Sequence, residues 1–520
     1  MASAASSTDR LGALPKEVLA WIFDFVPEAD MPNLRLVCKY LGQFAELHLF
    51  SELSVESTRR RMQNLRDLSK RPHLAVCVLS VYWQADRFDR PTLDRSAWEK
   101  QREVNPASRE WNWSHEAQNI MKTDDGGLTT EYRDAFERQM KVFEEKCRGN
   151  PTPTECDRAY AVYWEESEGQ WEMQRTGFEQ ECLGDLFKAC RTLRKITIAI
   201  AHGIDGFRRR ARTAYLPTMM QPRGDFHPLD QGVYQVSETA KALYRQSRPI
   251  KELRLIDISY RLMMSPTDDA SMRYMMSGLE ELRIIFSCYV DPSAEAGDDD
   301  EVFEAARTEM EDQAFDEIRT AYHNNKLSGW LSEARSLRVL KLRMYHHDFD
   351  DRCPTIKSIL GSSTWPGLAQ LALRQFSATT DDLVALLLRH QKSLQYVYLA
   401  DIDLTTDGWL AVFLRIAGKM KSLEAFYLDG TLSEDGDVVY AFQDARDRFE
   451  QYVLDPTNRD PLKPTGPPAD PPSDTGDNNV DDEDDGHDHN HEGDDREDDV
   501  PDPLERGSKF FDWWETTYYY

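Results

Sequence analysis

Seven segments of the chain carry leucine-like residues in the pattern L-x-x-L-x-L, in which apolar and polar positions alternate. They begin at residues 193, 250, 279, 337, 368, 394 and 423 and read LRKITI, IKELRL, LEELRI, LRVLKL, LAQLAL, LQYVYL and LEAFYL. The intervals are 57, 29, 58, 31, 26 and 29 residues, so two are double and a unit of about 29 residues underlies the series. The alternation predicts a β-strand in each segment.

The stretches between the later strands carry apolar side chains at helical spacing. The three sets are Leu383, Leu386, Leu387 and His390; Leu410, Phe413, Leu414 and Ala417; and Val438, Phe442, Ala445, Phe449 and Val453. The repeating unit is therefore a strand, a loop and a helix. Stacked units of this kind predict an α/β solenoid.

The unit resembles the leucine-rich repeat, which implies a repeat domain over residues 72–454, with the LAVCVL run at 74–79 as its first strand. That family usually places Asn or Cys three residues after the last Leu. Here this position holds Ala201, Ile258, Ser287, Tyr345, Phe376, Ile402 and Thr431. We expect apolar packing to replace the hydrogen-bonded ladder, and hence an irregular solenoid.

Two insertions, 84–185 and 291–330, interrupt the repeats. Helical stretches are predicted around 131–147 in the first and from Phe303 to Ile318 in the second. The first insertion is rich in tryptophan, with Trp98, Trp111, Trp113, Trp164 and Trp171. These rings either pack the insertion onto the repeats or anchor a partner protein.

The first 50 residues predict a small all-α unit. Leu14, Val18, Ile22 and Val26 recur at helical spacing, and a second helix is expected to begin near Asp30 as its N-cap. That second helix places Leu34, Val37, Leu41 and Phe44 on one face. Helices this short bury little apolar surface by themselves, so their excess requires a partner or a following domain.

The string LPKEVLAWIFDFVPEADMPNLRLVCKYLGQFAELHLFSEL, residues 14–53, resembles the F-box, whose pattern is LPxE, an apolar helix, a short acidic link and LxxLRLVCRxW. The match has no gap. Met31 and Pro32 stand where Leu is usual, and Leu41 where Trp or Phe is usual. The resemblance implies that residues 11–53 form an F-box.

Members of the F-box family dock on a Skp-type adaptor, which joins them to a cullin complex, a ubiquitin ligase, while a repeat domain holds the substrate. The resemblance implies adaptor contact or motif packing for Leu14, Pro15, Val18, Leu19, Ile22, Phe23, Leu34, Leu36, Val37 and Leu41. It makes the chain a non-catalytic adaptor for a protein substrate of unknown identity. Two alternatives remain open: an acidic repeat protein that binds basic partners such as histones, and an F-box scaffold that does not direct degradation.

The balance of charge argues against nucleic acid as the main ligand. The chain has 63 Lys and Arg against 92 Asp and Glu, which gives −29, and residues 470–506 alone hold 17 acids and 2 bases. We expect residues 455–509 to be a proline-rich, acidic, disordered tail, followed by an aromatic segment, 510–520, that docks back on the fold. The run of three histidines from 487 to 491 is either a divalent-metal ligand set or part of this solvated tract.

No sequence motif of a catalytic, cofactor or metal site is present. The chain lacks GxSxG, Walker, HExxH, dinucleotide-glycine and paired CxxC patterns, so we expect neither an enzyme nor a bound cofactor or metal. Eight scattered cysteines fit reduced thiols in the cytoplasm or nucleus, and no apolar run approaches the ~20 residues of a membrane span. We therefore expect no contact with a membrane.

One further set of residues follows from the repeats. The middle residue of each L-x-L strand points away from the core, to the concave face of a solenoid. This column contains Thr197, Arg254, Arg283, Lys341, Ala372, Tyr398 and Tyr427, with Arg343 and Arg374 two positions on. Cations beside tyrosines predict a groove for an acidic or phosphorylated peptide, for which the chain's own tail would compete; the alternative is a solvated strand face.

Overall fold

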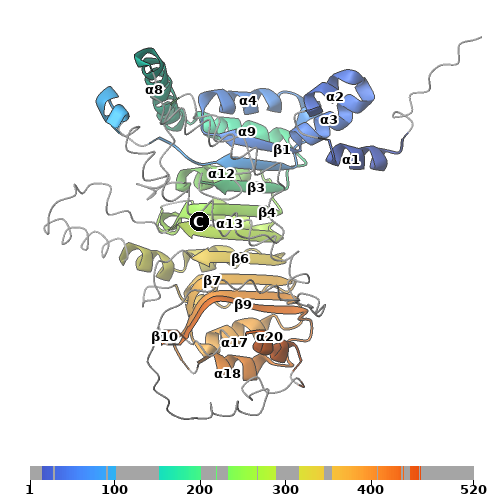
Figure 1. The fold of residues 1–520 in the computed structure, drawn as a ribbon, viewed down its shortest axis with the longest axis vertical. Helices are drawn as coiled ribbons and strands as arrows, with labels where there is room; N and C mark the ends of the chain where they lie inside the picture. The colour runs from blue at the N-terminus through green and yellow to red at the C-terminus, as the bar shows by residue number, and fades with distance from the viewer. Residues whose placement is uncertain are drawn as a thin grey trace, which may run out of the picture.

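The computed structural model describes residues 14–26, 30–88, 92–100, 152–200, 218, 232–265, 268–287, 316–344, 354–406, 408–434, 437–438, 446–455 and 457. It is a mixed α/β structure organised around a ten-stranded sheet (Figure 1). The strands are β1 (Glu52–Glu56), β2 (Ser80–Gln84), β3 (Lys195–Ala199), β4 (Glu252–Ser259), β5 (Glu281–Ser287), β6 (Val339–Met344), β7 (Gln370–Ala378), β8 (Tyr396–Leu404), β9 (Ala425–Glu434) and β10 (Asp437–Val438). They lie side by side in chain order; β1 to β9 are parallel and β10 is antiparallel to β9.

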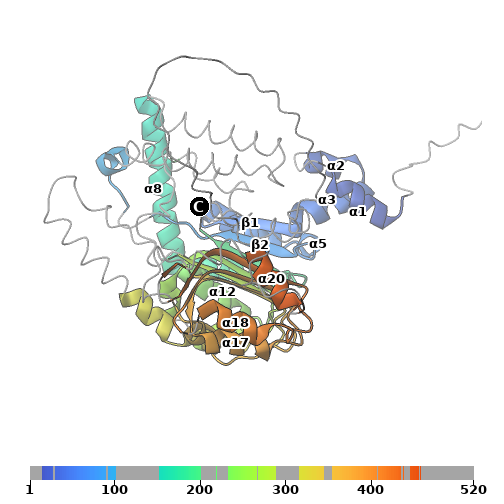
Figure 2. The same ribbon diagram turned by 60° about the horizontal axis from the view of Figure 1, so that its bottom comes forward.

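A layer of helices covers one face of the sheet. It consists of α4 (Arg59–Ser69), α9 (Phe178–Ala189), α12 (Val233–Arg245), α13 (Asp269–Ser277), α15 (Lys326–Leu331), α16 (Ile356–Leu360), α17 (Thr380–Arg389), α18 (Gly408–Ile416) and α20 (Arg446–Leu454). Each helix packs against the next one along the layer. Figure 2, which looks along the stack, shows α12, α17 and α18 on this side of the strands.

The seven strands predicted from L-x-x-L-x-L are confirmed as β3 to β9, and two predicted helices are confirmed as α17 and α18. The leucines of these strands face the helices. Leu253, Leu282, Leu340 and Leu399 are all fully buried in one core cluster that extends from Val55 to Val453. A single apolar core therefore holds the sheet and its helices together.

The start of the sheet differs from the prediction. The LAVCVL run is not a strand, because Pro72 opens the short helix α5 (Pro72–Ala75) and the strand follows at Ser80. The sheet also begins one strand earlier, with β1, whose first two residues lie inside the range expected for the helical motif. In the first predicted insertion, α9 belongs to the helical layer, and the long helix α8 (Pro153–Thr176) precedes it. Val438, expected in the last helix, lies in β10, and that helix is α20.

Four strands contain a residue with left-handed backbone near the position where the family usually has its Asn ladder. Asp257, Gln375, Asp401 and Gly430 have φ of 55°, 61°, 50° and 62°, each two residues after the second leucine-like residue of its strand. Side chains alternate along a strand, so a residue three positions after a buried leucine would normally face away from the core. The left-handed residue shifts this alternation by one position, so the next side chain points to the opposite face. Ile258, Phe376 and Ile402 consequently turn inward and are fully buried, which confirms the expected apolar packing at these positions.

Other predictions are tested only in part. The helices expected around 131–147 and from 303, most of residues 455–509 and the segment 510–520 lie outside the described residues, although Ile318 is described and buried. In the first insertion Trp98 is fully buried against Phe88 and Tyr163, in a cluster made of the insertion's own residues and separate from the core of the sheet, whereas Trp164 is 45% exposed. Among the described helices, none is both long enough and apolar enough to cross a membrane.

Gly430 provides a test of the left-handed positions. A Cβ at Gly430 would overlap the carboxylate of Asp401 and would also sit on a backbone at φ 62°. We expect Gly430→Ala to lower the free energy of unfolding by about 2 kcal/mol or more in denaturant titrations. The matched control is Gly169→Ala in α8, where a Cβ meets nothing within 4 Å and the change should stabilise by up to ~1 kcal/mol. Equal effects of the two substitutions would contradict this account.

Candidate functional site

Helix α1 (Lys16–Asp24) has one apolar face in the core and another in solvent. Leu19 and Phe23 are buried at 1% and 3% exposure and pack with α3 (Lys39–Ser51). The opposite face presents Val18, Trp21, Ile22 and, just past the helix, Phe25, at positions i, i+3, i+4 and i+7. Trp21 is 68% exposed and Phe25 75% exposed, with their rings edge to face at 5.9 Å between centroids.

The second helical segment is two helices rather than one. Helix α2 (Met31–Val37) is followed by Cys38, whose backbone is extended. The Cys38 thiol accepts the Leu41 N–H at 3.5 Å and so caps the start of α3. Asp30 precedes α2 but makes no side-chain cap. The break leaves Leu36 83% exposed and Val37 65% exposed at the end of α2. A continuous helix would have kept Val37 on the buried face.

The ten residues of the F-box pattern therefore separate into two groups. Leu19, Phe23 and Leu41 form a small core with Met31, Phe44 and Ala45, and Leu14 and Leu34 pack against it. Pro15, Val18, Ile22, Leu36 and Val37 are exposed. Sequence reasoning missed the most exposed rings, Trp21 and Phe25, although their spacing from Val18 was a usable signal. We define the docking face as Val18, Trp21, Ile22, Phe25, Leu36 and Val37.

The predicted column of strand residues exists as one continuous row. The strand register pairs Thr197 with Arg254, Arg254 with Arg283, Arg283 with Lys341, Lys341 with Ala372, Ala372 with Tyr398 and Tyr398 with Tyr427. A second register row pairs Arg343 with Arg374. The sequence thus identified neighbours that lie up to 230 positions apart in the chain, from Thr197 to Tyr427.

The column is not an open groove, and this corrects the prediction. Thr197, Arg283, Lys341, Ala372 and Tyr398 are all 2–3% exposed, so neither a free cation row nor a solvated strand face describes them. Arg254, Arg343, Arg374 and Tyr427 are half-buried.

Several of the cations are also matched by carbonyl or carboxylate oxygens. Arg254 lies 2.6 Å from Glu252 and 3.4 Å from Glu281, and Arg374 lies 2.5 Å from Asp401. Arg343 donates to the Gln375 side-chain oxygen at 3.2 Å, and the Tyr398 hydroxyl donates to Asp429. Whether this column contacts a substrate stays a prediction.

Lys341 is the most perturbed group of the column. Burial, aided by the positive charge of Arg283, lowers the pKa of its amine from 10.5 to about 5. The unfolded amine binds a proton as soon as the pH falls below 10.5, whereas the folded amine does so only near 5. Lys341 therefore reduces the stability of the fold progressively as the pH falls through that interval.

Replacing Lys341 by Met tests this burial. The variant should be more stable than the wild type near neutral pH. Its advantage should shrink as the pH rises toward 10, by up to ~1.4 kcal/mol per pH unit. Denaturant midpoints at neutral and alkaline pH measure the difference between the two proteins. A difference that does not depend on pH would show that the amine is solvated and charged in the folded protein.

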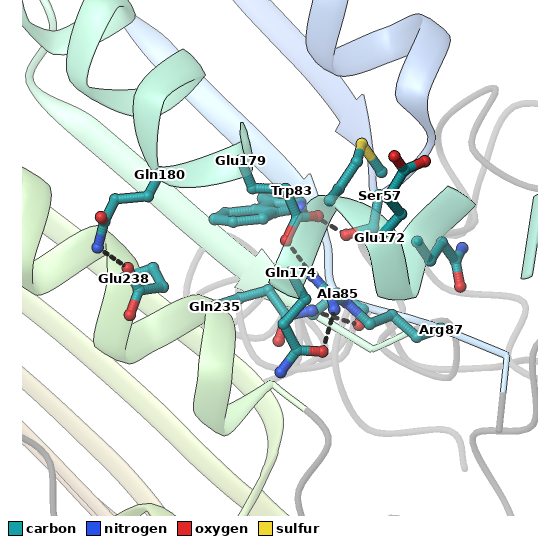
Figure 3. A network of polar contacts seen from close by, with 12 residues as sticks. Ser57, Trp83, Ala85, Arg87, Glu172, Gln174, Glu179, Gln180, Gln235 and Glu238 are labelled. Atoms are coloured by element: carbon teal, nitrogen blue, oxygen red, sulfur yellow. Dashed lines mark hydrogen bonds and ion pairs between the residues drawn. The ribbon is translucent and has the colours of Figure 1, made fainter. Parts of the chain in front are cut away.

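A buried polar network lies where β2 ends. Figure 3 shows Arg87, just after β2, between side chains of α8 and α9. Its guanidinium pairs with Glu179 and donates to the Gln174 side-chain oxygen at 2.9 Å, and it lies 4.7 Å from the centre of the Tyr234 ring. Glu179 is 0% exposed. Burial raises the pKa of this carboxyl, and the Arg87 charge opposes the rise.

The network connects three helices to the same strand end. Gln235 of α12 donates to the Ala85 carbonyl at 3.2 Å and Trp83 donates to Ser57 at 3.2 Å (Figure 3). The Gln170 side chain of α8 accepts the Phe88 N–H at 2.9 Å. Polar side chains of this kind fix one arrangement of helices, because any other leaves buried groups unsatisfied. We interpret the network as structural: it positions α8 on the sheet.

The Arg87–Glu179 pair should be costly to break. Arg87→Met leaves a buried carboxylate alone, and we expect a loss of about 3–5 kcal/mol of unfolding free energy. Without Arg87 the pKa of Glu179 rises further, so the carboxyl supports the fold only when protonated. The loss should therefore grow as the pH rises above about 5.

The surface pair Arg59–Glu172 serves as a control for the Arg87 experiment. Its side chains are 61% and 49% exposed at 2.7 Å, and Arg59→Met should cost less than ~1 kcal/mol at any pH. Thermal or denaturant unfolding at mildly acidic and mildly alkaline pH distinguishes the variants. A pH-independent loss in Arg87→Met would remove Glu179 from the explanation.

Two of the described cysteines, Cys182 and Cys190, are fully buried thiols, whereas Cys38 is exposed. Burial raises the pKa of Cys182 to about 11 and that of Cys190 to about 12, which keeps both thiols protonated. No group of three metal-ligating side chains occurs within the described ranges, and the histidines at 487–491 lie outside them.

Comparison with known proteins gives no assignment. No family model matches the chain, and no curated protein is significantly similar to it. The interpretation of the site therefore rests on its residues and geometry.

Proposed function

We propose that this chain is an F-box protein that recruits a protein substrate to a ubiquitin ligase. Residues 14–51 dock on a Skp-type adaptor, and the sheet and helices that follow are a leucine-rich-repeat solenoid that holds the substrate. The chain itself carries out no chemistry, and ubiquitin transfer belongs to other subunits. We place this activity in the cytoplasm or nucleus.

The docking face is the observation that carries the proposal. The helical unit already has a core of its own, formed by Leu19, Phe23, Met31, Leu41, Phe44 and Ala45. It nevertheless leaves two large rings and four aliphatic side chains in solvent, all within 20 residues of chain. Large apolar side chains left in solvent on a folded unit are typical of a protein interface, and tryptophan is prominent among residues that dominate binding energy.

The strand order supports the second half of the proposal. Nine parallel strands in strict chain order, with β1 to β9 connected one to the next through helices, are what stacked repeats of one unit produce. The regular recurrence of left-handed residues in β4, β7, β8 and β9 adds a second repeated feature. Such arrays present long surfaces, which suits the recruitment of another protein.

Substitution of the two exposed rings tests adaptor binding without disturbing the core. Trp21→Ala with Phe25→Ala should weaken binding to a purified Skp-type adaptor by about 500-fold or more, since each ring at an interface centre contributes ~2 kcal/mol or more. The measurement is calorimetry with the full chain. Leu14 is a poorer choice, because it packs against the core and its loss would also unfold the unit.

The matched control is Trp164→Ala with Leu414→Ala, which removes apolar side chains that are 45% and 57% exposed on other helices. This control should bind the adaptor as the wild type does. Undiminished binding by the Trp21 and Phe25 variant would contradict the assignment. Adaptor binding without ubiquitination of any associated protein would instead support an F-box scaffold.

A further inference from the structure

Exposed cations collect along the edge of the sheet where the parallel strands begin. At this amino edge the turns stack through backbone hydrogen bonds: Lys251 N–H to the Arg194 carbonyl, Glu280 to Lys251, Arg338 to Glu280 and Ala369 to Arg338, each at 2.8 Å. Corresponding turns therefore follow one another at the strand spacing of ~4.8 Å.

Nine cations of these turns and of the helix ends beside them form what we name the basic ridge. They are Lys188, Arg191, Arg194, Arg245, Arg335, Arg338, Lys392, Lys419 and Lys421, and all are exposed. None of the nine forms an ion pair with a carboxylate among the described residues. The neighbouring acids are already engaged, since Glu280 pairs with Lys251 and Glu424 accepts the Tyr396 hydroxyl at 2.6 Å.

The helix macrodipole does not account for the ridge. Cations in the last turn of a helix interact favourably with its carbonyl end, but the effect falls off within that turn. Only Lys188 in α9 and Arg245 in α12 lie in a last turn. Arg335 and Arg338 lie four and seven residues beyond the end of α15 at Leu331, and Lys421 lies five beyond the end of α18 at Ile416.

Nine like charges along seven strands repel one another and attract anions locally, although the chain as a whole carries −29. The ridge is interrupted at β5, where Glu280 stands, and at β7, where Ala369 does. Separate groups of cations suit discrete carboxylates better than the uniform charge of a nucleic-acid backbone. From β3 to β9 the edge spans ~29 Å, which is the length of about nine residues of extended chain.

We propose that the basic ridge binds an extended acidic segment of a partner protein. The interpretation of that partner as a recruited substrate rests on the proposed function. The N-terminal helices join the sheet at this same amino edge, because α3 ends at Ser51 directly before β1 begins (Figure 1). An acidic segment held there lies on the same side of the sheet as the docking face.

The test uses a fluorescent glutamate peptide of about ten residues and the full chain in anisotropy titrations. Arg335→Gln, Arg338→Gln and Lys392→Gln together should weaken binding about tenfold or more, and raising the salt concentration should weaken wild-type binding similarly. The matched control, Arg60→Gln, Arg158→Gln and Arg175→Gln, removes three exposed cations from α4 and α8. It should change the affinity less than about twofold.

Three results would overturn the proposal. The ridge variant and the control could bind the peptide equally. A single-stranded oligonucleotide of equal charge could bind the ridge more tightly than the peptide, which would assign the ridge to nucleic acid. The peptide could bind only after deletion of residues 470–506, which would show that the chain's own acidic segment occupies the ridge.

Adaptor affinity, measured on the same ridge variant, should be unchanged. A failure of the ridge proposal is therefore separable from a failure of the docking face.

Discussion

The structure depends on the burial of leucine-like side chains between the parallel strands and the helical layer. One cluster joins Val55 at the first strand to Val453 in the last helix, so every unit of the sheet is supported by its neighbours. The helical unit at the N-terminus stands apart, because Leu19, Phe23 and Met31 belong to a separate core. This separation explains how α1 and α2 present apolar side chains to solvent without weakening the sheet.

Acidic residues occur at both ends of the strands, since Glu252, Glu280 and Glu281 lie at or next to strand starts, but the exposed cations are concentrated at one end. Lysine and arginine gather where strands begin, whereas Asp268 and Asp269 of α13 and Asp381 and Asp382 of α17 lie where strands end and helices begin. The acids match the positive ends of the helices, which is an ordinary structural role. The cations extend well beyond the reach of that effect. This is why we propose a binding role for the exposed cations of the amino edge and not for the column on the sheet face, most of which is buried.

Periodicity predicted the strands of the repeats because a buried leucine at every second position leaves little choice of register. It failed where the apolar run was continuous. In residues 74–83 almost every side chain is apolar, and the run begins as a short helix that starts at Pro72. The strand β1 was missed because its alternating residues, Leu53 and Val55, directly follow the helical stretch of α3, where the F-box pattern predicts only helices. Burial of Lys341 and Arg283 could not be foreseen, since a strand pattern says which face a residue is on and not what covers that face. The family pattern identified the core of the helical unit but not Trp21 and Phe25, which occupy positions the pattern leaves free.

The central claim is that the N-terminal helices form a preformed docking face and that the sheet is not needed for it. Hydrogen–deuterium exchange of the full chain, with and without a purified Skp-type adaptor, tests this claim most directly. The account predicts slower exchange on adaptor binding in the peptides that contain α1, α2 and α3, and unchanged exchange in β3 to β9. Unchanged exchange in α1 and α2, or slowing confined to the sheet, would contradict it.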